Sequence, residues 1–260
     1  MDWTIWAGLA AGLLISVVTA PVGVSGAVFL LPVQLSVLGV PSPAVTPTNL
    51  LFNVVAGPGA LWRYRRDGAL RDGLARRLVL WTLPGVVVGA AVRVFVLPGP
   101  GAFRLLVAAL LLPLGTWLCL RTLRPVRLPS DTAEPSAPAL AALGLTVGTV
   151  GGIYGIGGGS LLGPVLAARG MPMTRIAPAT LATTFTTSIA GAAAYALLAL
   201  ASPGPVAPDW RLGVACGLGG LIGGYLGARL QPRLPESALR LLLGALAAAL
   251  GALYAVQAVA

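Results

Sequence analysis

Apolar residues occur in ten runs along the chain, separated by short stretches that are polar or rich in glycine and proline. In the first half of the chain these runs cover residues 3–20, 24–39, 48–62, 78–97 and 103–121. In the second half they cover residues 138–153, 156–169, 179–200, 211–228 and 240–258. A helix of about 20 residues crosses the ~30 Å hydrocarbon core of a bilayer, and several runs are long enough to do so. The pattern predicts an all-α polytopic membrane protein.

The two halves share their glycine, proline and arginine positions in the same order. Gly23, Gly26 and Pro32 recur 132 positions later as Gly155, Gly158 and Pro164, and Pro41, Pro47 and Leu50 recur 131 positions later as Pro172, Pro178 and Leu181. Further along, Gly85, Gly89 and Arg104 recur as Gly220, Gly224 and Arg240. Chance repetition of alanine and leucine would not keep these landmarks in order. We therefore predict two transmembrane repeats, 1–129 and 138–260, joined by a polar cytoplasmic linker at 130–137.

The number of segments and the arginine positions predict the orientation of the repeats. Five segments in each repeat are an odd number of crossings, so the second repeat should lie inverted relative to the first. If the N-terminus is outside, loops 63–77, 121–137, 169–178 and 229–240 are cytoplasmic and hold 14 of the 17 arginines. This agrees with the positive-inside rule and predicts a multi-pass protein of the cell (inner) membrane with both termini on the outer side. The second and third segments of each repeat are short, and a re-entrant hairpin would lower the number of full spans without changing the orientation.

Composition and charge narrow the possible functions. The chain has 260 residues, of which 57% are hydrophobic and 9% charged. Its net charge of +10 comes from arginines in short loops, which is typical of membrane topology signals and not of a nucleic-acid-binding surface. No carboxylate or histidine lies deep in an apolar run, so an intramembrane proton relay is not expected. No motif of an enzyme or a metal site is present, and we expect neither catalysis nor a cofactor.

Glycine clusters at residues 23–26 and 155–159 interrupt the apolar sequence at the same place in both repeats. Non-helical backbone inside a membrane is tolerated where it is buried in protein or lines a cavity, and transporters hold substrate between such broken helices. The helices that follow, expected from Val24 and Ile156, would direct their positive N-terminal ends at the breaks and favour an anion. The candidate binding residues are Gly23, Ser25, Gly26, Gly155, Gly157, Gly158, Gly159 and Ser160. Close helix packing is the alternative; a nucleotide-binding loop is disfavoured because no lysine follows and no strand precedes.

A polar stripe follows each break. Proline and then threonine or asparagine, at Pro47 and Pro178, predict helix N-termini at Thr48-Asn49 and Thr180. Hydroxyl and amide side chains then recur at a spacing of three and four residues: Thr48, Asn49 and Asn53 in the first repeat, and Thr180, Thr183, Thr184 and Thr187 in the second. The stripe suits either substrate binding or hydrogen bonds between helices.

Three arginines have alternative interpretations. Arg93 is the one charge well inside a predicted span, where it would either attract an anion or extend to the membrane interface. Arg104 and Arg240 begin the last helix of each repeat and suit either the mouth of a pathway or helix anchoring. Cys119 and Cys216 lie inside apolar runs and are expected to be packing residues.

The chain resembles the TauE/SafE sulfite-exporter family. The resemblance rests on GVSGAVFLLP from Gly23 and GIGGGSLLGP from Gly155, each followed about fifteen residues later by a helix start, AVTPTNL or IAPATL, and on RYRRDG and LPGVVVGAAVR. It covers essentially the whole chain. It implies a permease for small anions, chiefly sulfite and sulfonates, whose path is lined by the glycine motifs and the threonine-bearing helix starts. The repeats differ at Ser25 and Gly157 and at Asn49 and Thr180, so the two halves of the site are not identical.

The sequence thus predicts an alternating-access transporter that holds a small anion near the middle of the bilayer, between residues 23–26, residues 155–159, Asn49 and Thr180. Backbone N–H groups and hydroxyls would replace part of the hydration shell of the anion. An anion channel, a sodium- or proton-coupled importer and a non-transporting accessory membrane protein are the alternatives.

Overall fold

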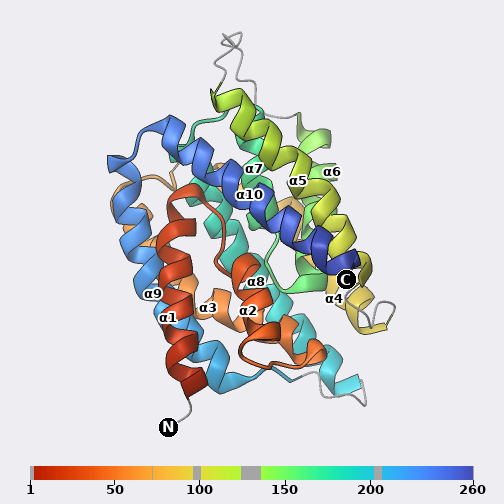
Figure 1. Ribbon diagram of the computed structural model, residues 1–260. Coiled ribbons are helices and arrows are strands. Elements are labelled where there is room, and N and C mark those ends of the chain that lie inside the picture. Colours follow the sequence, from red (N-terminus) through yellow and green to blue (C-terminus); the bar gives the residue numbers. More distant parts are fainter. Residues whose placement is uncertain (1–2, 72, 96–100, 124–135, 202–206, 260) are drawn as a thin grey trace.

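The computed structural model describes residues 3–71, 73–95, 101–123, 136–201 and 207–259, and these residues form α-helices, short 3-10 helices and connecting turns. In chain order the elements are α1 (Trp3–Thr19), η1 (Ala20–Val22), α2 (Ala27–Ser36), α3 (Ser42–Arg66), α4 (Leu74–Phe95), α5 (Gly101–Leu123), α6 (Ala137–Tyr154), α7 (Gly159–Ala168), α8 (Met173–Ala201), α9 (Trp210–Leu230), η2 (Gln231–Arg233) and α10 (Glu236–Val259). Each predicted apolar run corresponds to one α-helix (Figure 1). Most of the predicted linker, 130–137, lies outside the described residues.

Five helices within the described residues are long and apolar enough to cross a membrane. The candidate spans are Trp3–Val22, which combines α1 and η1, and Leu74–Phe95, Ala137–Tyr154, Met173–Leu198 and Glu236–Gln257. By contrast, α2 and α7 have only 10 residues each, or about 15 Å of helix, and cannot cross the hydrocarbon core alone. The structure therefore confirms the all-helical membrane class, and the second segment of each half is only a partial span.

The third helix of each half is longer than predicted. Instead of starting beside Thr48 and Thr180, α3 and α8 start at Ser42 and Met173 and have 25 and 29 residues. The prediction treated Pro47 as a first-turn proline, but Pro43 has that position in α3. An internal proline removes one backbone hydrogen bond, and α3 and α8 accommodate Pro47 and Pro178 inside the helix.

The helices after the breaks begin later than predicted, at Ala27 and Gly159 instead of Val24 and Ile156. Gly23 and Gly155 have φ values of +74° and +68°, which end the preceding helical segments in the left-handed conformation that glycine adopts without strain. In Figure 1 the chain turns back at η1, and α2 runs toward the end of the molecule where α1 began.

The main helix pairs each combine one helix from either half of the chain. α1 packs against α9 and α6 against α4; α3 packs against α9 and α8 against α4; α5 packs against α10 and α3 against α8. Each helix has a counterpart in the other half: α6 for α1, α8 for α3, α9 for α4 and α10 for α5. Replacing every helix by its counterpart gives the same set of pairs. At Gly12, Gly89 and Gly219 an added Cβ would lie closer than 3.0 Å to a backbone oxygen of the facing helix, so the α1–α9 and α4–α6 pairs meet backbone to backbone.

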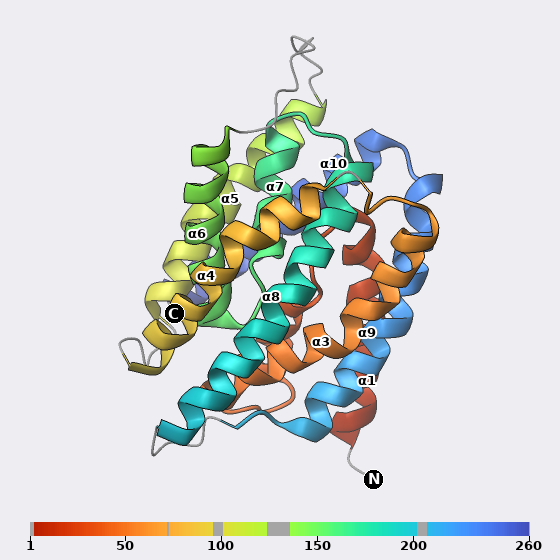
Figure 2. The ribbon, with the colours of Figure 1, turned by 180° about the vertical axis from the view of Figure 1, so that it is seen from behind.

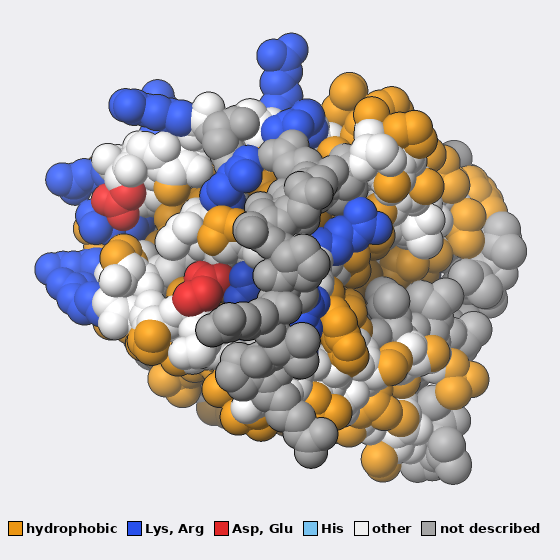
Figure 3. Space-filling model, turned by 90° about the horizontal axis from the view of Figure 1, so that it is seen from above, with side chains coloured by type: hydrophobic (Ala, Val, Ile, Leu, Met, Phe, Trp, Pro, Cys, Tyr) orange, Lys and Arg blue, Asp and Glu red, His pale blue; other side chains and the backbone are white. Residues whose placement is uncertain are grey.

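Helix directions are visible in Figures 1 and 2. α1 begins at the lower end and α6 at the upper end, and α3 ends at the upper end, where α4 begins. Arg63, Arg65 and Arg66 lie in the last turn of α3, and Arg76 and Arg77 in the first turn of α4. Figure 3 looks onto this end and shows several arginine side chains around its rim.

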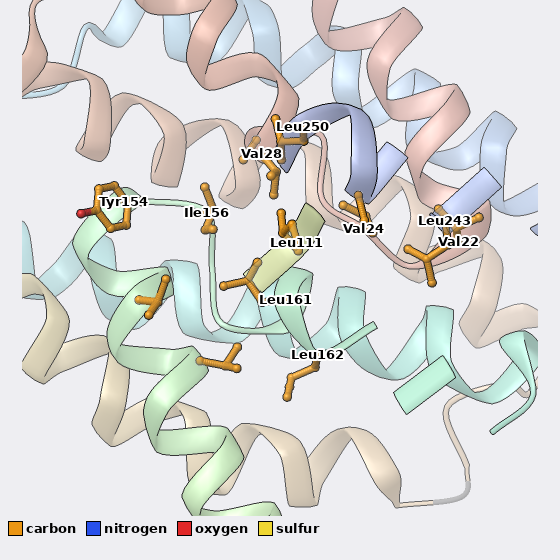
Figure 4. Close-up of a cluster of buried hydrophobic side chains, with 14 of the residues drawn as sticks. Val22, Val24, Val28, Leu111, Tyr154, Ile156, Leu161, Leu162, Leu243 and Leu250 are labelled. Carbon is orange, nitrogen blue, oxygen red and sulfur yellow. The ribbon is translucent and has the colours of Figure 1, made fainter. Parts of the chain in front are cut away.

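A buried apolar cluster covers one side of both broken segments. Figure 4 shows Val24 and Val28 facing Leu111, Leu161 and Leu250. All five side chains are buried, and they surround a residual space of only about 10 Å³. Apart from Ser160, the residues around this space are apolar, and the space is too small for a polyatomic ion.

Candidate functional site

A cavity of about 40 Å³ lies beside the first break, between α1, α3, α8 and α9. It is lined by Ser16, Thr19, Ala20, Val24, Ser25, Gly26, Phe52, Asn53, Ala56, Gly57, Ala60, Leu181, Thr184, Phe185, Gly220 and Gly224. No charged residue is among these lining residues of the described chain. Because a water needs roughly 10–15 Å³ by this measure, the cavity has room for about three waters or one small polyatomic ion.

At least two hydrogen-bond donors of the cavity wall have no acceptor among the described residues. One is the backbone N–H of Gly26, the N-cap of α2. Another is the hydroxyl of Thr19, a side chain that is 2% exposed. A buried donor without an acceptor costs roughly 1–3 kcal/mol. Both donors, together with the positive end of the α2 dipole, therefore favour a guest that accepts hydrogen bonds.

Ser25 and Asn53 connect the cavity wall to the second break. The Ser25 hydroxyl donates to Asn53 Oδ1 and accepts the Ala27 N–H at 3.1 Å. The Ser25 N–H donates to Ser160 Oγ at 3.3 Å, and Asn53 Nδ2 donates to the Gly155 carbonyl at 3.4 Å. These bonds hold Ser25 and Asn53 in fixed orientations, so the two breaks form one polar network.

At the second break, the backbone N–H equivalent to that of Gly26 has an acceptor. Gly158, the counterpart of Gly26, donates its N–H to Thr187 Oγ1 at 3.1 Å. A Cβ on Gly151 would lie 2.8 Å from the Gly158 nitrogen, which shows how closely α6 packs on this break. In the first half, Ala56 stands at the position equivalent to Thr187 and Thr19 at the position equivalent to Gly151. The cavity therefore forms beside the first break and not beside the second. In the second half, the Thr187 side chain and the closely packed α6 occupy the equivalent space.

The structure brings only some of the predicted residues to the cavity. Ser25, Gly26, Asn53 and Thr184 line it, whereas Gly23, Thr48, Asn49, Gly155, Gly157, Gly158, Gly159, Ser160, Thr180 and Thr183 do not. Several of the latter serve the protein's own packing. Thr48 and Thr183 donate to backbone carbonyls of their own helices, and Asn49 Nδ2 donates to the Ala27 carbonyl at 3.0 Å.

Sequence reasoning missed Ser16, Thr19, Ala56 and the two phenylalanines Phe52 and Phe185. Ser16 and Thr19 are hydroxyl side chains three positions apart in the last turn before the break. That spacing was a usable signal, because residues three apart on a helix share a face. Ala56 carries no polar signal and is recognised only by comparison with Thr187.

Of the three arginines with alternative interpretations, Arg93 and Arg240 do not line the cavity. Arg93 is in the last turn of α4 and does not line the cavity. Arg240 donates to the carbonyls of Ala167 and Met171, each at 2.7 Å, and pairs with Glu236 at 3.0 Å. It therefore anchors the end of α7 to α10. The side chain of Arg104 lies outside the described residues.

A multi-pass helical protein with broken helices around an uncharged, donor-lined cavity has the features of a membrane transporter. Residues 8–254 match the family described as Sulfite exporter TauE/SafE, and the chain belongs to this family. It is therefore a multi-pass membrane protein of a transporter family, as the resemblance in the sequence predicted. Neither a curated protein nor a solved structure matches the chain.

Proposed function

We propose that the protein is a permease for small anions, with sulfite or a small sulfonate as substrate, and that the anion binds in the cavity beside the first break. The observation that carries this proposal is the pair of open donors, the Gly26 N–H and the Thr19 hydroxyl, in a cavity without a carboxylate. A sulfur oxyanion presents several strong acceptors in a small volume and fits a cavity of about 40 Å³ better than a longer sulfonate does.

We propose alternating access as the mechanism, with the two halves of the chain arranged as inverted repeats. The exchange of helix pairs between halves and the opposite starting ends of α1 and α6 support this arrangement (Figure 1). An inside-negative potential favours the exit of an anion by about 2.3 kcal/mol per charge per 100 mV. Export driven by the membrane potential is therefore the simplest cycle for a site without a titratable group.

The test of the function is anion flux into liposomes that contain the purified protein, with the potential set by a potassium ionophore. Sulfite, sulfoacetate, sulfate and chloride are compared. We expect selective, potential-dependent flux of sulfite. Absence of flux for all four anions under every gradient, from protein shown to be folded, would contradict the permease.

Replacing Thr19 by valine should lower the rate of sulfite flux at low concentration by about 10- to 100-fold. The change keeps the shape of the side chain and removes a hydrogen bond to a charged ligand, worth roughly 1.5–3 kcal/mol. Thr146→Val is the matched control, since Thr146 is exposed on α6 and bonds only within its own helix. Equal flux for both variants would show that Thr19 does not contact the substrate.

The proposed orientation predicts which end of the molecule a membrane-impermeant maleimide labels in intact cells. In a background with Cys119 and Cys216 replaced by alanine, Ala207→Cys, just before α9, should react from outside. Arg65→Cys, at the arginine-rich end, should react only after the membrane is permeabilised. Both positions are exposed in the structure. The reverse pattern would place the arginine-rich end outside.

A further inference from the structure

Three backbone carbonyls of the first break are held by donors from three different elements. The Ala20 carbonyl accepts the hydroxyl of Tyr64, on α3, at 3.1 Å. The Pro21 carbonyl accepts Gln231 Nε2, on η2, at 2.8 Å, and the Gly23 carbonyl accepts the hydroxyl of Thr180, on α8, at 2.7 Å. All three donor side chains are buried. A short break thus receives a separate buried side chain for each of three carbonyl oxygens.

These donors determine where the carbonyl oxygens point. None of Tyr64, Gln231 and Thr180 lines the cavity, although Ala20 does. Pro21 and Gly23 do not line the cavity either, and all three oxygens are bound by side chains outside its wall. Gly26, whose N–H has no acceptor among the described residues, does line the cavity. Backbone N–H groups on one edge of a turn make an anion-binding concavity, whereas inward-facing carbonyls would bind a cation.

We infer that Tyr64, Gln231 and Thr180 are positioning residues that give the cavity its preference for anions. The Pro21 and Gly23 carbonyls have no other hydrogen-bond donor among the described residues, whereas the Ala20 carbonyl also accepts the Gly23 N–H at 3.1 Å. A buried unpaired carbonyl is costly. The partners available inside the cavity would be water or a cation. By binding these oxygens, the three donors keep the cavity wall positive without any charged side chain. This inference rests on the proposed anion site and concerns how the charge preference of that site arises.

Gln231 has a second contact that suits this role. Its Nε2 also donates to the Met173 carbonyl, the first residue of α8, at 3.1 Å. Both hydrogens of the amide are therefore used, one on the break and one on the helix that carries Thr180. Removing the amide should disturb two of the three carbonyl positions, so its effect should exceed that of removing either hydroxyl.

The experiment measures sulfite binding to the purified full-length protein by calorimetry, with and without sodium as a competing cation. Tyr64→Phe, Thr180→Val and Gln231→Met remove one donor each at nearly constant volume, and Thr180→Ser is the control that keeps the hydroxyl. We expect Thr180→Val and Gln231→Met to bind sulfite about tenfold or more weakly and to become inhibited by sodium. Tyr64→Phe should have a smaller effect, because the Ala20 carbonyl still accepts the Gly23 N–H. Thr180→Ser should bind sulfite as the wild type does and remain insensitive to sodium.

The outcomes separate this inference from the proposed function. If the wild type binds none of sulfite, sulfoacetate, sulfate and chloride, the proposed function is contradicted. The inference is then contradicted as well, because it rests on that function. Sulfite binding by the wild type together with equal, sodium-insensitive binding by all variants would overturn the inference alone. Thermal melting of each variant distinguishes lost positioning from lost folding: a variant that melts like the wild type and binds weakly supports the inference. If one variant does not fold, the other two decide the result, because each removes a different donor.

Discussion

Replacing Ala56 by threonine is expected to abolish anion transport while the protein remains folded. Thr187 occupies the equivalent position in the second half, and its hydroxyl accepts the N–H of Gly158. Ala56 lines the cavity on the corresponding turn of α3. A threonine there should accept the Gly26 N–H in the same way, so the protein would fill its own binding site. Loss of a hydrogen bond to a charged ligand, with the space also filled, should reduce flux by about 100-fold or more.

The control for this prediction is Ala56→Val. Valine has the volume of threonine but no hydrogen-bond acceptor, so the difference between the two variants isolates the capping of the Gly26 N–H from simple filling. Liposome flux and melting temperature should be measured for both. Transport by Ala56→Thr at the wild-type rate would mean that the anion binds elsewhere.

Replacing Gly155 by alanine is expected to prevent stable folding. Gly155 has a φ of +68°, and an added Cβ would overlap the Thr46 backbone, lying closer than 3.0 Å to its carbonyl oxygen. The backbone strain alone costs roughly 1–2 kcal/mol, and overlap with a rigid backbone atom adds roughly 1–3 kcal/mol. The variant should lose yield in the folded fraction and melt well below the wild type.

Gly39→Ala provides a matched comparison. Gly39 has nearly the same φ, +69°, but nothing lies within 4 Å of the Cβ that alanine would add. This variant should show the conformational cost without the overlap and remain folded. Equal melting temperatures for the two variants would show that the contact between the second break and α3 contributes nothing to stability.

The sequence was sufficient to predict the helices, the breaks and the family. Uninterrupted apolar runs and paired glycines are local signals, and they identified every α-helix within the described residues and the positions of Gly23 and Gly155. Helix starts were less predictable. Pro47 looks like a first-turn residue in the sequence, and only packing against the neighbouring helices shows that α3 begins five residues earlier.

The cavity could not be predicted from local signals, because it depends on differences between two similar environments. Thr19 and Gly151 occupy equivalent positions, but only the glycine lets its helix pack directly on the break that follows. Likewise, Ala56 is an ordinary apolar residue until Thr187 is seen to satisfy the equivalent N–H. The inverted arrangement of the repeats, their boundaries and the side of the membrane on which the termini lie stay predictions.

The glycine contacts between α1 and α9 and between α4 and α6 determine which parts of the molecule can move as units. Helices that meet backbone to backbone have no intervening side chains that could change rotamer and let them slide. Each such pair takes one helix from either half of the chain, so it behaves as a rigid body that crosses the repeat boundary. Under the proposed alternating access, we therefore expect the moving units to be built from these mixed pairs, divided along a plane that the linear order of the chain does not reveal.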